Sequence, residues 1–504
     1  MKTTRFHLCL IVGTALLTGC GDMSMPGGGN EPPPVTAADL TAAAPDAGVK
    51  AFYGQRQWAP AWSRKAEETL KAAIDARAAH GLDQMALWPD LNGRSPAERE
   101  ALLTGAALRY AGALANGAAD PASLYEVYTL KGPDTNVAAG LQQALTDGKL
   151  ADWLNGLAPR TPEYKALSQA YLTQREEAQG ARTQDIAPGE ALKPGAEDAR
   201  VPAIRAALAG NGYLASASGT GNTYTPEIAK AVEALQTDFG VTADGVIGPD
   251  TLAVLNTGPQ ERARALAVSM ERMRWLTRTP AADRIDVNTA AGELRYFKGG
   301  KVADKRKVIT GKPGNETPQL ESPIYRLVAN PTWTIPRSIE QKEMASRDEE
   351  YFRRNNISRN ADGWLVQESG PENSLGLVKF DMRNEHAIYL HDTNAKQLFD
   401  RQQRQLSHGC VRVHDALGFA GMIAAAEGVE KEWAKARDSG KQSFVALPRE
   451  IPARLIYQTV QVGEDGEIQY RTDPYGWDDA VEKALGFTPV SRNRFRTDVE
   501  DTGP

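Results

Sequence analysis

One short stretch of the chain concentrates the side chains that can perform covalent chemistry. Cys410 stands within Ser407-His408-Gly409-Cys410-Val411-Arg412, and His391 precedes it by 410 − 391 = 19 residues. A thiol attacks an amide as its thiolate, so a neighbouring group must take its proton or lower its pKa. An imidazole within hydrogen-bond reach does both. The sequence therefore predicts Cys410 as a nucleophile and His391 as its base.

The residues around the cysteine suggest how a reacting carbonyl would be held. His408 would share a face with Cys410 in an extended chain, but Gly409 between them can turn the chain and part them. The same freedom would let the amides of Gly409 and Cys410 converge on a developing oxyanion. Arg412 offers a planar pair of donors suited to a substrate carboxylate.

These side chains need strands to position them, and residues 284–480 show the period-two pattern of a mostly β domain. Alternating segments at 285–287, 294–297, 308–309, 377–380 and 387–390 predict strands, and His391 follows the last of them directly. A helix is expected over 417–427. A charged insertion at 338–370 interrupts the strands, and an insertion of this kind often covers a site.

In the preceding half of the chain, apolar residues recur with the spacing of an α-helix. Residues 49–180 and 258–283 predict a helical scaffold, separated by a compact unit at 199–257. In that unit, one amphipathic stripe is formed by Ile228, Val232, Leu235 and Phe239.

The two ends of the chain differ from these domains. Residues 1–19 have a basic start and an apolar run, which predicts a signal peptide ending before Cys20. Residues 20–48 are rich in glycine, proline and alanine and are expected to form a flexible tether. Residues 481–504 are expected to form a C-terminal tail. Cleavage before Cys20 would change the formal charge from −6 to −6 − 2 = −8.

Composition narrows the class of protein. The 504 residues carry a net charge of −6, so there is no excess of Lys and Arg to neutralise a nucleic acid. Three cysteines are too few for a disulfide scaffold or a four-cysteine zinc site. If Cys20 carries lipid, Cys410 is the one thiol left after cleavage.

The string at 407–412, with Tyr-Leu-His-Asp-Thr at 389–393, resembles the active-site signature of bacterial L,D-transpeptidases. Met270-Glu271-Arg272 and the segment at 330–336 resemble the large subfamily that has a scaffold domain and a capping subdomain. Asp-Gly-Val-Ile-Gly-Pro-Asp-Thr at 244–251 resembles the small three-helix peptidoglycan-binding module. Leu-Thr-Gly-Cys at 17–20 resembles a lipobox, whose cysteine receives a diacylglycerol.

The resemblance implies a multidomain α+β protein: a helical scaffold, a three-helix peptidoglycan-binding module and a mostly β catalytic domain with a helical capping insertion. It implies Cys410 as nucleophile and His391 as base, with His408 and Gly409 shaping the oxyanion site. The substrate-binding residues would be Tyr389, Ser407, Arg412 and Trp333. The implied partners are peptidoglycan stem tetrapeptides, glycan strands and carbapenem inhibitors, with no metal and no organic cofactor.

Several alternatives remain open at this point. Water in place of an amine would give an L,D-carboxypeptidase, and an inactive domain would leave a wall-tethering lipoprotein. Cys410 by itself is also compatible with a buried small hydrophobe. A zinc peptidase is disfavoured, since the histidines at 386, 391, 408 and 414 lack helical His-x-x-x-His spacing. The expected location is the periplasm, lipid-anchored, with Gly21 favouring the outer membrane over the inner.

Overall fold

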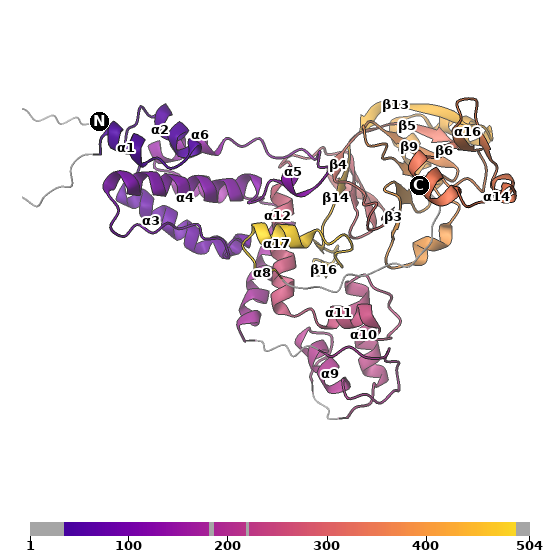
Figure 1. The fold of residues 1–504 in the computed structure, drawn as a ribbon, viewed down its shortest axis with the longest axis horizontal. Helices are drawn as coiled ribbons and strands as arrows, with labels where there is room; N and C mark the ends of the chain where they lie inside the picture. Colours follow the sequence, from indigo (N-terminus) through magenta and orange to yellow (C-terminus); the bar gives the residue numbers. More distant parts are fainter. Residues whose placement is uncertain (1–34, 181–185, 218–220, 490–504) are drawn as a thin grey trace, which may run out of the picture.

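The computed structural model describes residues 35–180, 186–217 and 221–489. The predicted signal peptide at 1–19 and the lipidation site Cys20 lie outside the described residues, as does most of the predicted tether. In the view of Figure 1, a helical body lies on one side, a β-rich body on the other and a small helical unit below them. This arrangement is the multidomain α+β organisation expected from the sequence.

The helical body is built from the first half of the chain and one later helix. Its helices begin at good capping residues: Ser95, for example, accepts the Glu98 amide while Glu98 accepts the Ser95 amide. Helices α8 and α12 pack together and carry the chain between this body and the others. The elements are α1 (Ala37–Ala43), α2 (Ala47–Gln55), α3 (Arg64–Asp75), η1 (Ala76–His80), α4 (Pro96–Asn116), α5 (Pro121–Leu124), α6 (Val137–Thr146), α7 (Leu150–Leu157), α8 (Pro162–Gly180) and α12 (Pro259–Arg274).

The predicted tether overlaps the first of these helices. Thr36 caps α1 through a reciprocal bond with Asp39, and Leu40 is fully buried in the scaffold core. One well-placed leucine and a capping box are enough to dock this helix, although the segment is poor in apolar residues. The ordered scaffold thus starts before residue 49.

The small unit contains α9 (Val201–Gly210), α10 (Pro226–Asp238) and α11 (Pro249–Leu255). The predicted stripe is confirmed, because Ile228, Val232, Leu235 and Phe239 are all buried in its core. The core also takes in Ile186 and Leu192, so the chain before residue 199 packs on this unit as well.

The β-rich body has a curled sheet of eleven strands in the order β13-β5-β9-β10-β12-β3-β2-β1-β14-β4, with β11 beside β3. Helices α15 (Ala416–Glu427) and α16 (Glu430–Asp438) contribute to its apolar core. The strands are β1 (Arg284–Asn288), β2 (Glu293–Lys298), β3 (Lys301–Gly311), β4 (Leu320–Glu321), β5 (Ile324–Ala329), β9 (Val378–Met382), β10 (Leu390–His391), β11 (Gln405–Ser407), β12 (Val411–Val413), β13 (Ser443–Ile451) and β14 (Ala453–Ile456); the short helix η3 (Lys396–Asp400) lies between β10 and β11.

The insertion between β5 and β9 folds around its own small core, which includes Trp333, Ile339 and Met344. It contains helices, as predicted, and also a three-stranded sheet in the order β6-β8-β7. Its elements are β6 (Trp333–Thr334), α13 (Arg337–Ile339), the π-helix η2 (Glu340–Met344), α14 (Glu349–Arg354), β7 (Ile357–Arg359) and β8 (Leu365–Gln367).

After β14 the chain returns to the scaffold through β15 (Val460–Val462), β16 (Ile468–Tyr470) and α17 (Asp478–Ala484). Helix α17 crosses the tail boundary predicted at residue 481. Val481 and Leu485 are fully buried in the scaffold core, and Arg272 of α12 pairs with Asp478 at 2.5 Å. Burial of this apolar face, which the sequence pattern alone did not reveal, makes residues 481–489 part of the scaffold.

Within the described ranges, none of the helices combines the length and apolar character required to cross a bilayer.

Candidate active site

The candidate site lies on one face of three neighbouring strands, β9, β10 and β12. Strands β10 and β12 run parallel with His391 opposite Arg412, whereas β9 runs antiparallel with Lys379 opposite His391. Side chains opposite one another in a sheet point to the same face. Lys379, His391 and Arg412 therefore form one row across the strands.

The adjacent row on this face follows from the same register. Continuing the ladders by one residue places Tyr389 level with Asp381 and with Cys410, and the Val411 amide donates to the Tyr389 carbonyl at 3.1 Å. The intervening residues Phe380, Leu390 and Val411 point the other way, into the apolar core. The alternation thus brings Cys410 and His391 to the same face of adjacent strands.

The Cys410 thiol and the His391 imidazole share this face of the sheet, and within the described residues no hydrogen bond joins them. The Cys410 thiol donates to the Ala387 carbonyl at 3.7 Å, and the Tyr389 hydroxyl also bonds its sulfur. Both ring nitrogens of His391 are buried, and neither has a hydrogen-bond partner among the described residues. The His391 imidazole can therefore accept a proton from a donor that comes within hydrogen-bond distance.

Burial keeps both groups uncharged. It raises the pKa of the Cys410 thiol, against the lowering effect of bonds from Tyr389 and of the Lys379 and Arg412 charges. Burial also holds the pKa of His391 well below its usual value, and the neighbouring Arg412 lowers it further. The thiol is therefore protonated and the imidazole neutral at rest, so His391 can act as a base at neutral pH.

The turn before the nucleophile is closed by Ser407 and Gly409. The Ser407 hydroxyl donates to the Cys410 carbonyl at 2.6 Å and accepts the Gly409 amide at 3.2 Å. Gly409 has φ +115°, which L side chains rarely adopt. Ser407 is fully buried and supports the turn, whereas the sequence predicted contact with substrate. Because the Gly409 amide is already engaged, the Cys410 amide is the better oxyanion donor.

Thr317, which the sequence pattern did not single out, stabilises this turn through its hydroxyl. Its hydroxyl donates to the Gly409 carbonyl at 2.8 Å and accepts the Gly311 amide at 2.8 Å. Tyr475, from the C-terminal segment, donates to the Gly311 carbonyl at 2.7 Å. Nothing in the local sequence pattern marks either residue, since each acts across a long separation along the chain.

The Ala387 carbonyl, which accepts the Cys410 thiol, is held by hydrogen bonds within its own loop. Ala387 has φ +55°, unusual for a non-glycine residue. The Asn384 carboxamide spans this loop: its oxygen accepts the His386 and Ile388 amides, and its nitrogen donates to the Ile388 carbonyl. An asparagine that bonds its own loop is a recognisable turn signal, so this residue could have been found from the sequence.

The strand end that carries His391 is fixed by the next residue, Asp392. Its carboxylate accepts the Leu377 amide at 2.9 Å and pairs with Lys396. Gly376 has φ +60°, and a Cβ there would lie 2.3 Å from an Asp392 oxygen. Glycine is required at this position for both reasons.

The insertion lies over the face of the sheet that carries the site. His408 pairs with Glu343 of η2, and Arg412 lines a cavity of about 190 Å³ between the insertion and the sheet. Trp333 lines the same cavity, and its indole nitrogen is buried with no acceptor among the described residues. Trp333 is 2% exposed and belongs to the core of the insertion.

Within residues 35–180, 186–217 and 221–489, no three His, Cys, Asp or Glu side chains gather as a metal site would require.

Comparison with known proteins places this geometry in a class. Residues 282–430 match the family of L,D-transpeptidase catalytic domains (YkuD), residues 47–170 match a scaffold domain, and residues 197–255 match the family described as "Putative peptidoglycan binding domain". The chain thus carries a YkuD-type L,D-transpeptidase catalytic domain joined to a scaffold domain and a peptidoglycan-binding domain.

Individual proteins are also similar to parts of this chain. A protein of Haemophilus influenzae described as "Putative L,D-transpeptidase" is 28% identical over 246 residues, which cover 44% of this chain and 49% of that protein. The match thus spans about half the length of the curated relative. Solved structures include an L,D-transpeptidase from Stackebrandtia nassauensis (14% identity, 54% of this chain and 97% of that chain, TM-score 0.23). Another is the catalytic domain of the E. faecium enzyme acylated by ertapenem (17% identity, 27% and 85%, TM-score 0.18).

Proposed function

We propose that this protein is a peptidoglycan L,D-transpeptidase that forms 3→3 cross-links through an acyl-enzyme on Cys410. The observation that carries the proposal is the strand register that puts Cys410 and His391 on one face of adjacent strands, with His391 neutral. A thiol beside an unprotonated imidazole is the arrangement needed for attack on an amide.

In the first half-reaction, the Cys410 thiol turns from the Ala387 carbonyl toward His391, which takes its proton. The sulfur attacks the carbonyl carbon between stem residues three and four, and the oxyanion is held by the Cys410 amide. The C–N bond then breaks, His391 returns the proton to the amine of the leaving D-alanine, and a thioester remains.

In the second half-reaction, the side-chain amine of residue three of another stem attacks the thioester. His391 takes a proton from this amine, a new amide forms and the thiol is regenerated. Arg412, which lines the cavity beneath the insertion, is placed to attract a substrate carboxylate.

Carbapenem acylation tests the nucleophile. Intact-protein mass after meropenem treatment should show one adduct on the wild type and none on Cys410→Ala. An equal adduct on Cys410→Ala, or no adduct on the wild type, would contradict the assignment.

Muropeptide analysis separates the possible products. Tetrapeptide-rich sacculi incubated with the protein should yield 3→3 dimers. Tripeptides without dimers would indicate an L,D-carboxypeptidase, and unchanged muropeptides with retained sacculus binding would indicate a tethering protein.

The location is proposed from the N-terminal sequence: a lipoprotein anchored through Cys20, facing the periplasm, at the outer membrane. Cells fed a labelled fatty acid should label the wild type and not Cys20→Ala, and membrane fractionation should place it with the outer membrane.

A further inference from the structure

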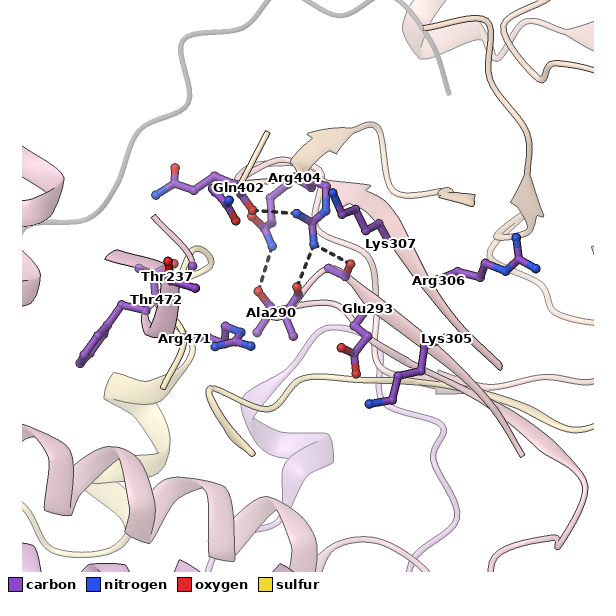
Figure 2. A pocket seen from close by; sticks show the side chains of 16 residues that line it. Thr237, Ala290, Glu293, Lys305, Arg306, Lys307, Gln402, Arg404, Arg471 and Thr472 are labelled. Carbon is purple, nitrogen blue, oxygen red and sulfur yellow. Dashed lines mark hydrogen bonds between the residues drawn. The ribbon is translucent and has the colours of Figure 1, made fainter. Parts of the chain in front are cut away.

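A pocket of about 320 Å³ lies between the peptidoglycan-binding domain and the catalytic domain (Figure 2). One wall is formed by Thr237, in the last turn of α10, and by Phe239 and Gly240, which follow this helix. The others come from the β2–β3 region, the loop at 402–405 and residues 471–472. This volume is within the range of small-ligand sites.

Arg404 supplies a buried positive charge to this pocket. Its side chain is 8% exposed, and all its hydrogen bonds in the described structure go to main-chain carbonyls, including those of Val308 and Gly292. Figure 2 shows several of these bonds at the back of the pocket. Burial, and then the nearby Arg471, lower its pKa to about 10, so the charge persists at neutral pH. Within the part of the chain that the structure describes, this cation is bonded to no carboxylate.

Arg471 adds a second cation with spare donors. One terminal nitrogen donates to the Asp238 carbonyl at 2.6 Å and to the Tyr470 carbonyl at 2.9 Å, and the other donates to the Gln469 side-chain oxygen at 3.0 Å. No ion pair to a carboxylate is formed by Arg471 within the described ranges. Glu293, the one acidic residue lining the pocket, is already bonded to Arg295 at 2.5 Å.

The third donor in this pocket is the side-chain nitrogen of Gln403. The side-chain nitrogen of Gln403 is buried without a hydrogen-bond partner among the described residues, and Gln403 lines this pocket. By contrast, the Gln405 side-chain nitrogen is satisfied by the carbonyls of Thr289 and Ala290. A buried donor left unpaired beside two cations calls for an anionic acceptor.

We propose that this pocket binds a carboxylate of a peptidoglycan stem peptide through Arg471 and Gln403, with Arg404 supplying charge behind them. The identity of the ligand rests on the proposed function. It is favoured because the peptidoglycan-binding domain forms one wall, and because stem peptides carry free carboxylates. A stem peptide bound here would contact both domains at once, at a site separate from the nucleophile.

Beside the pocket, the peptidoglycan-binding domain already touches the segment that follows β14, so the pocket is a preformed site. Phe239 stacks on Tyr470 with ring centroids 5.5 Å apart, and the Arg471 bond to the Asp238 carbonyl joins the same segments. A ligand therefore meets fixed donors and does not have to order the interface first.

The test is calorimetric titration of the full chain with soluble disaccharide-tetrapeptide, after meropenem has blocked Cys410. The acylated wild type should still bind. Arg471→Gln and Gln403→Met should each weaken binding, Arg471→Gln by about tenfold or more because it removes a charged donor. Lys301→Gln, an exposed residue of β3 that does not line the pocket, is the matched control and should bind as the wild type does.

Each other outcome overturns the proposal. These are no binding by the acylated wild type, binding by both pocket variants that is as tight as that of the wild type, or binding of D-alanine or inorganic phosphate that is as tight as that of the disaccharide-tetrapeptide. Gln403→Met keeps the Arg471–Asp238 contact, so it separates loss of the ligand donor from loosening of the domains. If meropenem forms no adduct, the proposed function fails, whereas titration of the unacylated chain and its variants still decides the pocket.

Discussion

Glu343 of the insertion pairs with His408, two residues before the candidate nucleophile. This contact joins the insertion to the turn that carries Cys410. The sequence left the position of His408 open, and its partner comes from a segment 65 residues earlier (408 − 343). The pair therefore links the position of the insertion to the shape of the site.

Breaking the Glu343–His408 pair should clearly slow the acylation of Cys410, with a smaller effect on the thermal stability of the protein. Glu343→Gln removes the charge and should reduce the meropenem acylation rate by about tenfold or more, since a charged hydrogen bond contributes about 1.5–3 kcal/mol. Glu340→Gln is the matched control, because Glu340 pairs with Arg337 and Arg359 inside the insertion. Stopped-flow acylation and thermal unfolding measure the two effects. Equal rates in both variants would show that the contact does not position the site.

The row Lys379–His391–Arg412 predicts a particular pH dependence. Burial and the adjacent Arg412 lower the pKa of His391, and Lys379 adds to this effect. Since the base is the unprotonated imidazole, acylation should stay constant through pH 6.5 and fall only at clearly lower pH. Lys379→Gln should raise the pKa of His391 and move this acid limb to higher pH.

The control for this experiment is Lys431→Gln, an exposed lysine of α16, which should leave the pH profile unchanged. The lowered pKa of His391 also makes the free energy of unfolding depend on pH. The contribution of the neutral histidine is fully present above the unfolded pKa of about 6.5, and it is lost as the pH falls and the unfolded chain takes up the proton. An acid limb centred at or above pH 6.5 in the wild type would refute the assignment of a neutral base.

The Tyr389 hydroxyl bonds the Cys410 sulfur and lowers the pKa of the thiol. Tyr389→Phe removes this bond, so the thiol should ionise at higher pH. Iodoacetamide alkylation at pH 8 should slow by about three- to tenfold, the effect of one hydrogen bond of about 0.5–1.5 kcal/mol. Tyr325→Phe on β5 serves as the control. An unchanged alkylation profile in Tyr389→Phe would mean that the hydroxyl does not stabilise the thiolate.

Thr317→Val keeps the volume of the side chain and removes the hydroxyl that bonds the Gly409 carbonyl and the Gly311 amide. Two buried groups lose their partner, so the free energy of unfolding should fall by about 1–3 kcal/mol. Acylation should slow as well, because the turn before Cys410 loses its support. Thr317→Ser retains the hydroxyl and should restore the rate, whereas a simple packing defect would persist in it. Denaturant unfolding and acylation kinetics provide the two readouts.

Much of the fold could be read from local patterns. The alternation that predicted strands at 285–287, 294–297 and 377–380 corresponds to β1, β2 and β9, and the stripe on α10 is buried as expected. Those patterns work because the side-chain period of a strand or helix is set by the backbone itself. The ends of the domains were less predictable, since α1 and α17 are short and are held by a few buried residues.

For the candidate site, the sequence by itself supplied the reactive types: one thiol, one imidazole and a glycine between His408 and Cys410. It did not determine strand register, and only register places Lys379, His391 and Arg412 in one row. Thr317, Tyr475 and Glu343 reach the site through contacts between segments far apart in the chain. Such contacts leave no periodic trace in a sequence, because they depend on how separate elements pack and not on local backbone geometry.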